Sequence, residues 1–373
     1  MMAMKASFHL INKLVVENLK HRPVRTLLSA LAIGVQVTMV LTLVGVSQGV
    51  LQDSARRSKA VGADIMVRAP GSSIIGGSVN YPEKVLKLIA TFPHVKLTTG
   101  TLVVPAGGLL SYVTGIDLPS FSAMSGGFRY LKGGPFRDPY DVIIDEVYAR
   151  EQHLHINDTL HLLNKQWRVC GIVEPGKLAR VMMRIDVLRE LSSTGSNQIT
   201  VGYVKLDDPA NTQETIAYIK QKLGPYRLDS MADLASLYSV SSIPILSNFI
   251  DIIIALAVLI GFLVVFLSMY TAVLERTREI GVLKALGASP AYVLNVLMRE
   301  TTLLAIIGSI LGILLTYGTR WLIQAFVPSM PQLIVYDWWP IAAAIALAGA
   351  WLGAAYPGLK AARQQVIEAL SYE

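Results

Sequence analysis

The sequence predicts a multi-pass α-helical membrane protein with four transmembrane helices and a large extracytoplasmic α+β domain inserted between the first and second helices. Hydrophobic residues make up 53% of the 373 residues and charged residues only 16%, which is too apolar for an ordinary soluble domain of this length. Four uncharged stretches approach or exceed the roughly 20 helical residues that cross a bilayer. These stretches cover residues 27–49, 252–274, 301–319 and 338–359.

The N-terminal segment, residues 1–26, is expected to form a cytoplasmic amphipathic helix. Phe8, Ile11 and Leu14 recur at helical intervals, and charged side chains such as Lys13 and Lys20 fall on the other faces. A basic amphipathic helix of this kind lies along the membrane surface. The apolar stretch that follows is longer than the apolar core of a signal peptide, so residues 27–49 are predicted to be an uncleaved first transmembrane helix.

The basic residues indicate the orientation of the chain. Lys and Arg cluster before the first span, in residues 275–300 between the second and third spans, and in the tail, residues 360–373. Short segments rich in Lys and Arg face the cytoplasm, whereas the short outer loop, residues 320–337, carries only Arg320 and Asp337 as charges. Both termini are therefore expected in the cytoplasm. Because the basic residues flank the membrane spans, the net charge of +7 indicates contact with membrane lipid and not with nucleic acid.

Residues 50–247 are long enough to bury a core of their own and are expected to fold outside the cytoplasm. "ADIMVRAP" and "QITVGYVKLDD" predict strands, while "YPEKVLKLIATFP" and "NTQETIAYIKQKLG" predict helices. Asn211 and Glu214 are spaced as a capping box for the second of these helices. The middle of the domain, about residues 107–196, is richer in strands and predicts a β-rich subdomain, in which Asn157 and Asp158 are expected to form a turn between two strands.

No motif in the sequence supports catalysis or metal binding. His153, His155 and His161 form the only histidine cluster, and their spacing matches no zinc signature. The chain has neither a nucleophile elbow nor a GxxxxGK[ST] phosphate loop. The four apolar stretches also lack the ionisable residues that mark a solute path. We therefore expect no catalytic, cofactor or metal site and no hydrophilic pore.

Small residues recur at four-residue spacing within three of the predicted spans. This spacing lets helix backbones approach closely, which favours helix packing within the bundle or between protomers. The pairs are Ala30 and Gly34, Gly308 and Gly312, and Gly349 and Gly353.

The segment "ERTREIGVLKALGAS", residues 275–289, is the most hydrophilic part of the C-terminal third. Ile280, Leu283 and Leu286 fall on one face of a helix. Gly287 is well placed to end that helix in a left-handed conformation, and Ser289 then begins the helix that leads into the third span. The sequence thus predicts a short protruding helix followed by a sharp break.

This segment resembles the signature of the FtsX and MacB-like permease family of ABC transporters. "NLKHRPVRTLLSALAIGV" is similar to the family's entry into its first span, and "GADIMV" to the strand that follows. "DEVYAREQHLHINDTLHLLNKQWRVCGIVEP" resembles the family's β-rich extracytoplasmic segment. "YPGLKAARQQVIEAL" resembles its C-terminal ending, except that Val366 stands where a proline is common. The resemblance implies an FtsX-like permease domain at residues 245–367 and a MacB-like periplasmic core within residues 50–247.

In that family the cytoplasmic helix after the second span docks on an ATP-binding subunit. The resemblance implies that Ile280, Leu283 and Leu286 supply the apolar contact, while Gly281 and Gly287 allow close approach or the turn. Charged side chains would fix the orientation by pairing with the partner. These are Glu275, Arg276, Arg278, Glu279 and Lys284.

The resemblance further implies a non-catalytic permease subunit of the mechanotransmission type. An ATP-binding subunit in trans would bind the ATP, and a second permease copy, identical or different, and a membrane-fusion adaptor are the other expected partners. The expected task is efflux, or export of a lipoprotein or another hydrophobic substrate. An FtsX-type regulator of an extracytoplasmic cell-wall hydrolase is the alternative, and a membrane-anchored enzyme is a third reading without a supporting motif.

Overall fold

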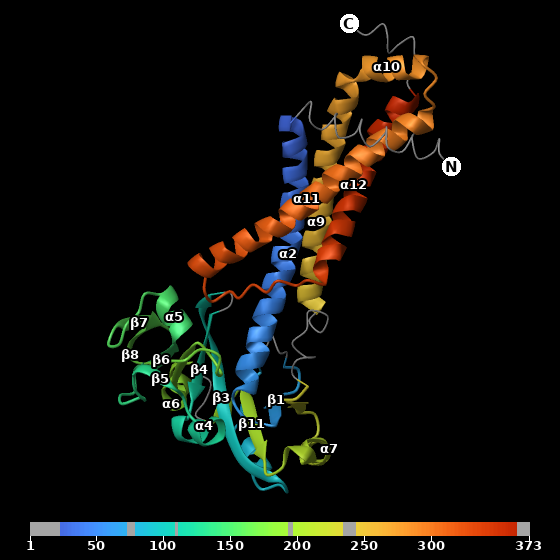
Figure 1. Ribbon diagram of the computed structural model, residues 1–373. Helices are drawn as coiled ribbons and strands as arrows, with labels where there is room; N and C mark the ends of the chain where they lie inside the picture. Colours follow the sequence, from blue (N-terminus) through green and yellow to red (C-terminus); the bar gives the residue numbers. More distant parts are fainter. Residues whose placement is uncertain (1–22, 73–78, 109–110, 193–196, 234–243, 364–373) are drawn as a thin grey trace. The chain divides into compact units, whose positions relative to one another are not determined.

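The computed structural model describes residues 23–72, 79–108, 111–192, 197–233 and 244–363. The chain divides into two compact units, which are shown in Figure 1. The helical unit comprises residues 1–47, 245–322 and 332–373, and the sheet unit comprises residues 48–244 and 323–331. The amphipathic helix expected at residues 1–26 lies almost entirely outside the described residues, as does most of the tail after Arg363.

Four helices in the described residues are long and apolar enough to cross a membrane, which confirms the predicted number. Each is longer than the uncharged stretch from which it was predicted. The first helix continues ten residues past the predicted end of the first span, and its last part belongs to the sheet unit. The helices are α2 (Pro23–Lys59), α9 (Pro244–Glu275), α11 (Pro290–Phe326) and α12 (Trp338–Arg363).

Small residues set the helix packing inside the helical unit. A Cβ atom added to Gly312 of α11 would lie 2.6 Å from the Cβ atom of Val37 on α2, and one added to Gly308 would lie 2.7 Å from that of Ile33. Ala30 and Gly34 lie in the same contact, because their carbonyl oxygens face these two glycines. On α12, a Cβ atom at Gly353 would lie 2.7 Å from the carbonyl oxygen of Phe262 in α9, whereas Gly349 has more room. The predicted small-residue pairs therefore pack helices of the same chain.

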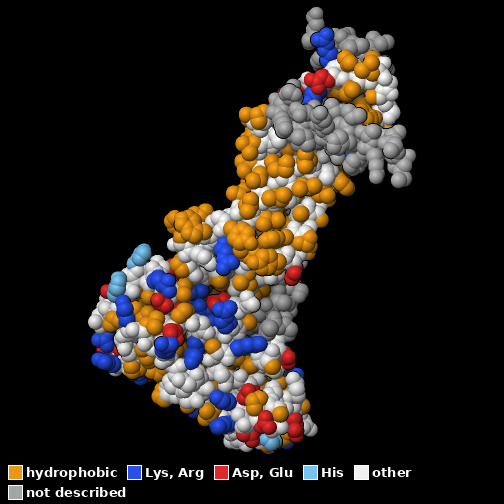
Figure 2. Space-filling view, viewed as in Figure 1, with side chains coloured by type: hydrophobic (Ala, Val, Ile, Leu, Met, Phe, Trp, Pro, Cys, Tyr) orange, Lys and Arg blue, Asp and Glu red, His pale blue; other side chains and the backbone are white. Residues whose placement is uncertain are grey.

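The outward faces of these helices are apolar. Figure 2 shows hydrophobic side chains covering the visible face of the helical unit, while Lys, Arg, Asp and Glu gather over the sheet unit. A bundle with an apolar exterior and close backbone contacts inside is suited to lipid surroundings. Large exposed side chains on this exterior include Leu31, Val35, Ile252, Leu256, Leu259, Leu263, Ile310 and Leu314.

The sheet unit is built on a ten-stranded mixed sheet, and all of its strands fall between α2 and α9 in the chain. The order is β12-β1-β11-β3-β4-β9-β6-β8-β5, with β7 paired to β8. The pairs β4–β9 and β6–β8 are parallel and the others antiparallel. The strands are β1 (Ile65–Arg68), β3 (Val95–Gly108), β4 (Ser111–Ile116), β5 (Tyr130–Gly133), β6 (Asp141–Asp145), β7 (Thr159–Leu162), β8 (Lys165–Val173), β9 (Val181–Arg184), β11 (Val201–Leu206) and β12 (Arg227–Ser230); β2 (Tyr81–Pro82) and β10 (Gln198–Ile199) form a separate pair.

Both faces of this sheet are covered, so its central strands are apolar on both sides. In β6, Val142 and Ile144 face one core and Ile143 faces the other, because successive side chains alternate across a strand. Most of the helices cover the first face, and α4 covers the second. The helices are α3 (Lys84–Ile89), α4 (Leu118–Ser125), α5 (Glu146–Glu151), α6 (Ile185–Leu191) and α7 (Thr212–Leu223), with a 3₁₀ turn, η1 (Pro209–Asn211), before α7.

The strands of residues 107–196 continue the same sheet through β3 and β4. Two details of this unit differ from the sequence-based expectations. The tight turn between β7 and β8 is Leu163–Asn164, where both residues have positive φ as in a type I′ hairpin turn, and not Asn157–Asp158. Asn211 makes no capping hydrogen bond to α7 because its side chain contacts His94.

Candidate functional site

The predicted protruding helix is present as α10 (Thr277–Ala285), directly after α9. The backbone leaves the helical conformation at Arg276, and the Thr277 hydroxyl donates a hydrogen bond to the carbonyl oxygen of Leu274 (2.9 Å). At the far end Gly287 adopts φ 94°, which favours glycine, and the Ser289 hydroxyl accepts a hydrogen bond from the backbone N–H of Tyr292. The helix is therefore bounded by a break at each end.

Ile280 does not lie on the outward face that its spacing predicted. Its side chain is only 7% exposed and packs with apolar side chains of α9, α11 and α12. Gly281 is buried as well. Because Ile280 is occupied by its own chain, the expectation that it contacts a partner is corrected: it anchors α10 to the helical unit. Its neighbours in this cluster are Val273, Val293, Leu297 and Ala361.

Two of the predicted docking charges are also held by the chain itself. The guanidinium of Arg276 pairs with Glu300 of α11, and both side chains are buried. The Lys284 ammonium donates a hydrogen bond to the carbonyl oxygen of Ala362 (2.8 Å), where a cation suits the C-terminal end of α12. The outward role expected for Arg276 is thus corrected, because a buried and paired guanidinium is not available to a partner.

The outward surface of α10 is an apolar ridge with charges beside it. The α10 ridge consists of Val282, Leu283 and Leu286, which are neighbours on a helix at three- and four-residue spacing. All three are exposed, and Leu286 is 81% exposed. The charged side chains of Glu275, Arg278 and Glu279 are exposed too. Val282 was not among the residues predicted from the sequence, although its four-residue spacing from Leu286 is a signal for it, and neither was Glu300.

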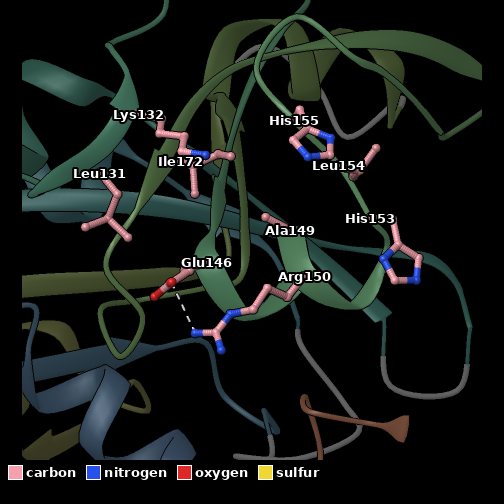
Figure 3. A pocket seen from close by; sticks show the side chains of 9 residues that line it. All are labelled: Leu131, Lys132, Glu146, Ala149, Arg150, His153, Leu154, His155 and Ile172. Atoms are coloured by element: carbon pink, nitrogen blue, oxygen red, sulfur yellow. Dashed lines mark ion pairs between the residues drawn. The ribbon is translucent and has the colours of Figure 1, made fainter. Parts of the chain in front are cut away.

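A hollow in the sheet unit brings together two of the three clustered histidines. Figure 3 shows His153 and His155 at its edge, beside α5. Its volume is about 290 Å³, and Arg150 and Glu146 form an ion pair of 3.2 Å at one side. The described residues contain no group of three or more His, Cys, Asp or Glu side chains that suits a metal ion. The remaining lining residues are Leu131, Lys132, Ala149, Leu154 and Ile172.

Two protein-family models match the chain and together cover most of it. The FtsX-like permease C-terminal model matches residues 252–366, which include α10. The MacB-like periplasmic core domain model matches residues 26–222.

Two named relatives align with most of this chain. The macrolide export ATP-binding/permease protein MacB of Escherichia coli is 25% identical over 395 aligned residues, covering 97% of this chain. The chain spans only about 60% of the length of that relative. The ABC transporter permease Rv0072 of Mycobacterium tuberculosis is 24% identical, with 89% of this chain and 90% of the relative covered. Among solved structures, the periplasmic region of MacB from Actinobacillus actinomycetemcomitans aligns with 48% of this chain and 94% of its own, at a TM-score of 0.38 and 13% identity.

Proposed function

The chain belongs to the FtsX and MacB-like permease family of ABC transporters, and from this premise we propose that it couples ATP hydrolysis by a separate ATP-binding subunit to movement of its sheet unit. As an ABC permease it requires an ATP-binding partner to supply the energy. In this proposal the chain itself is non-catalytic, and ATP is bound by the partner alone.

The observation that carries the proposal is the α10 ridge. Exposed apolar side chains bordered by charges mark sites of protein interaction, and an apolar helix face fits a groove on a partner. The helix beneath the ridge is fixed by Ile280, by Arg276 and by Lys284. A force applied to Leu283 and Leu286 by an ATP-binding subunit is therefore passed to α11 and α12 and is not lost in a loose connector.

The charge distribution supports the orientation in this proposal. Basic residues lie in and just before α10, in the first part of α11 (Arg299) and at the end of α12, and basic segments face the cytoplasm. We place the α10 ridge and both termini in the cytoplasm of a bacterial cell. The sheet unit then lies outside the inner membrane.

The substrate and further partners follow from the same proposal. The Escherichia coli relative is named for macrolide export, which supports efflux or export of a hydrophobic molecule or a lipoprotein by this chain. Two permease copies, identical or different, act with two ATP-binding subunits, and a membrane-fusion adaptor contacts the sheet unit. Capture of a cell-wall hydrolase by the sheet unit, in place of an adaptor or lipidated cargo, would assign the chain to the regulatory branch of the family.

The docking experiment uses the full chain, purified in mild detergent with the ATP-binding subunit encoded beside it. Replacing both Leu283 and Leu286 with serine should weaken binding of that subunit by about tenfold or more, since truncated interface anchors commonly cost over 1 kcal/mol each. Leu88→Ser is the matched control, because Leu88 is an exposed leucine of the sheet unit. An ATP-binding subunit that stays fully bound to the double variant would refute the proposal.

A further inference from the structure

A cluster of four charged side chains, two of them buried and two partly buried, joins the C-terminal part of α2 to the sheet. The Arg180 cluster consists of Asp53, Arg57, Asp145 and Arg180. Arg57 Nε lies 2.8 Å from Asp53 Oδ2, and Arg57 Nη1 lies 3.3 Å from Asp145 Oδ2. Arg180 closes the ring, with Nη2 3.5 Å from Asp53 Oδ2 and Nη1 3.8 Å from Asp145 Oδ2. All four residues belong to the sheet unit.

The cluster is balanced in charge but costly to bury. The Asp145 side chain is 1% exposed, and burial raises its pKa although both arginines oppose that shift. Burial likewise lowers the pKa of Arg180. Well-packed apolar side chains often stabilise a protein as well as or better than a buried ion-pair network. Stability is therefore a weak explanation for four charges at this place, whereas fixed geometry is what such a network supplies.

The cluster ties together parts of the chain that lead to two different membrane helices. Asp53 and Arg57 lie on α2, and the Arg57 carbonyl oxygen accepts a hydrogen bond from the backbone N–H of Leu178 (3.1 Å). Arg180 Nη2 donates to the carbonyl oxygen of Ser329 (2.7 Å), three residues beyond the end of α11.

The same side chains are anchored to the sheet. Asp145 ends β6 and caps α5 by accepting a hydrogen bond from the backbone N–H of Tyr148 (2.8 Å). Its own backbone N–H donates to the carbonyl oxygen of Arg180 (2.8 Å), just before β9 begins. Arg180 is the one member that contacts α2, the sheet and the segment after α11.

We propose that Arg180 is the positioning residue of a clamp that makes the end of α2, the segment after α11 and the sheet move as one body. The existence of the clamp is inferred from these contacts alone. Its use in passing nucleotide-driven motion of two membrane helices to the sheet rests on the proposed function.

The first experiment tests the clamp in the chain alone, reconstituted in lipid nanodiscs. With Cys170 replaced by alanine, spin labels are placed at Gln52 and His161, which are exposed on α2 and β7. The unaltered chain should give one narrow distance peak, and Arg180→Met should abolish it. Arg129→Met should preserve the peak, because the Arg129–Glu174 pair is exposed on the same unit. Arg180→Lys, which keeps the charge, should restore it in part.

Asp53→Asn is the second variant, and it tests the clamp if Arg180→Met does not fold. It retains the shape of the side chain and removes one charge, so it should broaden the peak without preventing folding. A narrow, unshifted distance peak in folded Arg180→Met refutes the clamp. If Arg180→Met does not fold, the same peak in Asp53→Asn refutes it. Neither result depends on an ATP-binding subunit.

The second experiment separates transmission from stability. With the ATP-binding subunit bound, ATPase activity is measured together with the nucleotide-dependent distance change between His161 labels on two permease copies. Arg180→Met should keep the ATPase activity and lose the distance change, whereas general destabilisation would lower both together. A normal distance change in Arg180→Met overturns the proposal. An unaltered chain without any nucleotide response counts against the proposed function, and the first experiment still decides the clamp.

Discussion

Arg276 Nη1 lies 3.3 Å from Glu300 Oε2, and this buried pair ties the link between α9 and α10 to α11. Glu300 is only 1% exposed. Removing one partner of a buried pair takes a counter-charge away from the other in a poorly solvated place, which typically costs more than the pair contributed.

Glu300→Gln is therefore expected to destabilise the protein by about 3–5 kcal/mol, the usual cost of breaking a buried pair. Thermal unfolding in detergent, followed by intrinsic fluorescence, measures the loss. The double variant Arg276→Met with Glu300→Gln should recover part of it because no charge is stranded. A double variant that is as unstable as the sum of the single changes would contradict this account.

Gly312 and Gly318 offer a matched test of helix packing, since both lie on α11. A Cβ atom at Gly312 would meet the backbone of Gly34 and the side chain of Val37, whereas nothing lies within 4 Å of one at Gly318. Gly312→Ala should lower stability in SDS titrations by forcing α2 and α11 apart. Gly318→Ala should be neutral or stabilise by up to about 1 kcal/mol, the helix propensity difference between the two residues. Equal losses in both variants would show that packing against α2 is not responsible.

Asp141 makes the stability of the sheet unit depend on pH. Burial alone would raise the pKa of its carboxyl group, but hydrogen bonds from the backbone N–H groups of Asp138 and Arg137 and from Arg168 outweigh burial and lower it. Because the folded-state pKa is lower than the unfolded one, this stabilisation is complete above about pH 4 and is lost as the pH falls through the folded-state pKa.

Asp141→Asn is expected to cost about 1.5–3 kcal/mol at neutral pH, as charged hydrogen bonds do, and progressively less as the pH falls through the folded-state pKa. Urea unfolding can be followed by the fluorescence of buried Trp167 in a chain whose other tryptophans are replaced by phenylalanine. Asp138→Asn is the control, because Asp138 contacts the same Arg168 from an exposed position. An Asp141→Asn penalty that stays constant throughout a titration from neutral to acidic pH would exclude the protonation of Asp141 as its cause.

Cys170 should be nearly inert in the folded protein. Burial, with a smaller contribution from the nearby charge of Asp141, raises the pKa of its thiol to about 12. At pH 8 the reactive thiolate should be about a thousandfold scarcer than in the unfolded chain, where the thiol has its ordinary pKa near 8.5. Iodoacetamide labelling rates in mild detergent and in denaturing SDS measure the ratio. Comparable rates in the two conditions would refute the expected protection.

The elements that depend on local sequence were predictable, and the contacts between distant residues were not. The four apolar helices and α10 follow from hydropathy and spacing. Periodicity identified Ile280 and Leu286 as apolar positions in and beside α10. It could not show which of the two faces its own chain, because that depends on where α11 and α12 pack. The pairing of Arg180 with Asp53, like that of Arg276 with Glu300, needs residues that only the folded chain brings together, and no local pattern marks them.

The unbroken length of α2 has a mechanical consequence. Its 37 residues form a single rod of about 55 Å, nearly twice the thickness of the bilayer core. For a rigid rod of that length, tilting one end by about 5° displaces the other by about 5 Å. Even a small tilt of so long a helix is therefore amplified along its length.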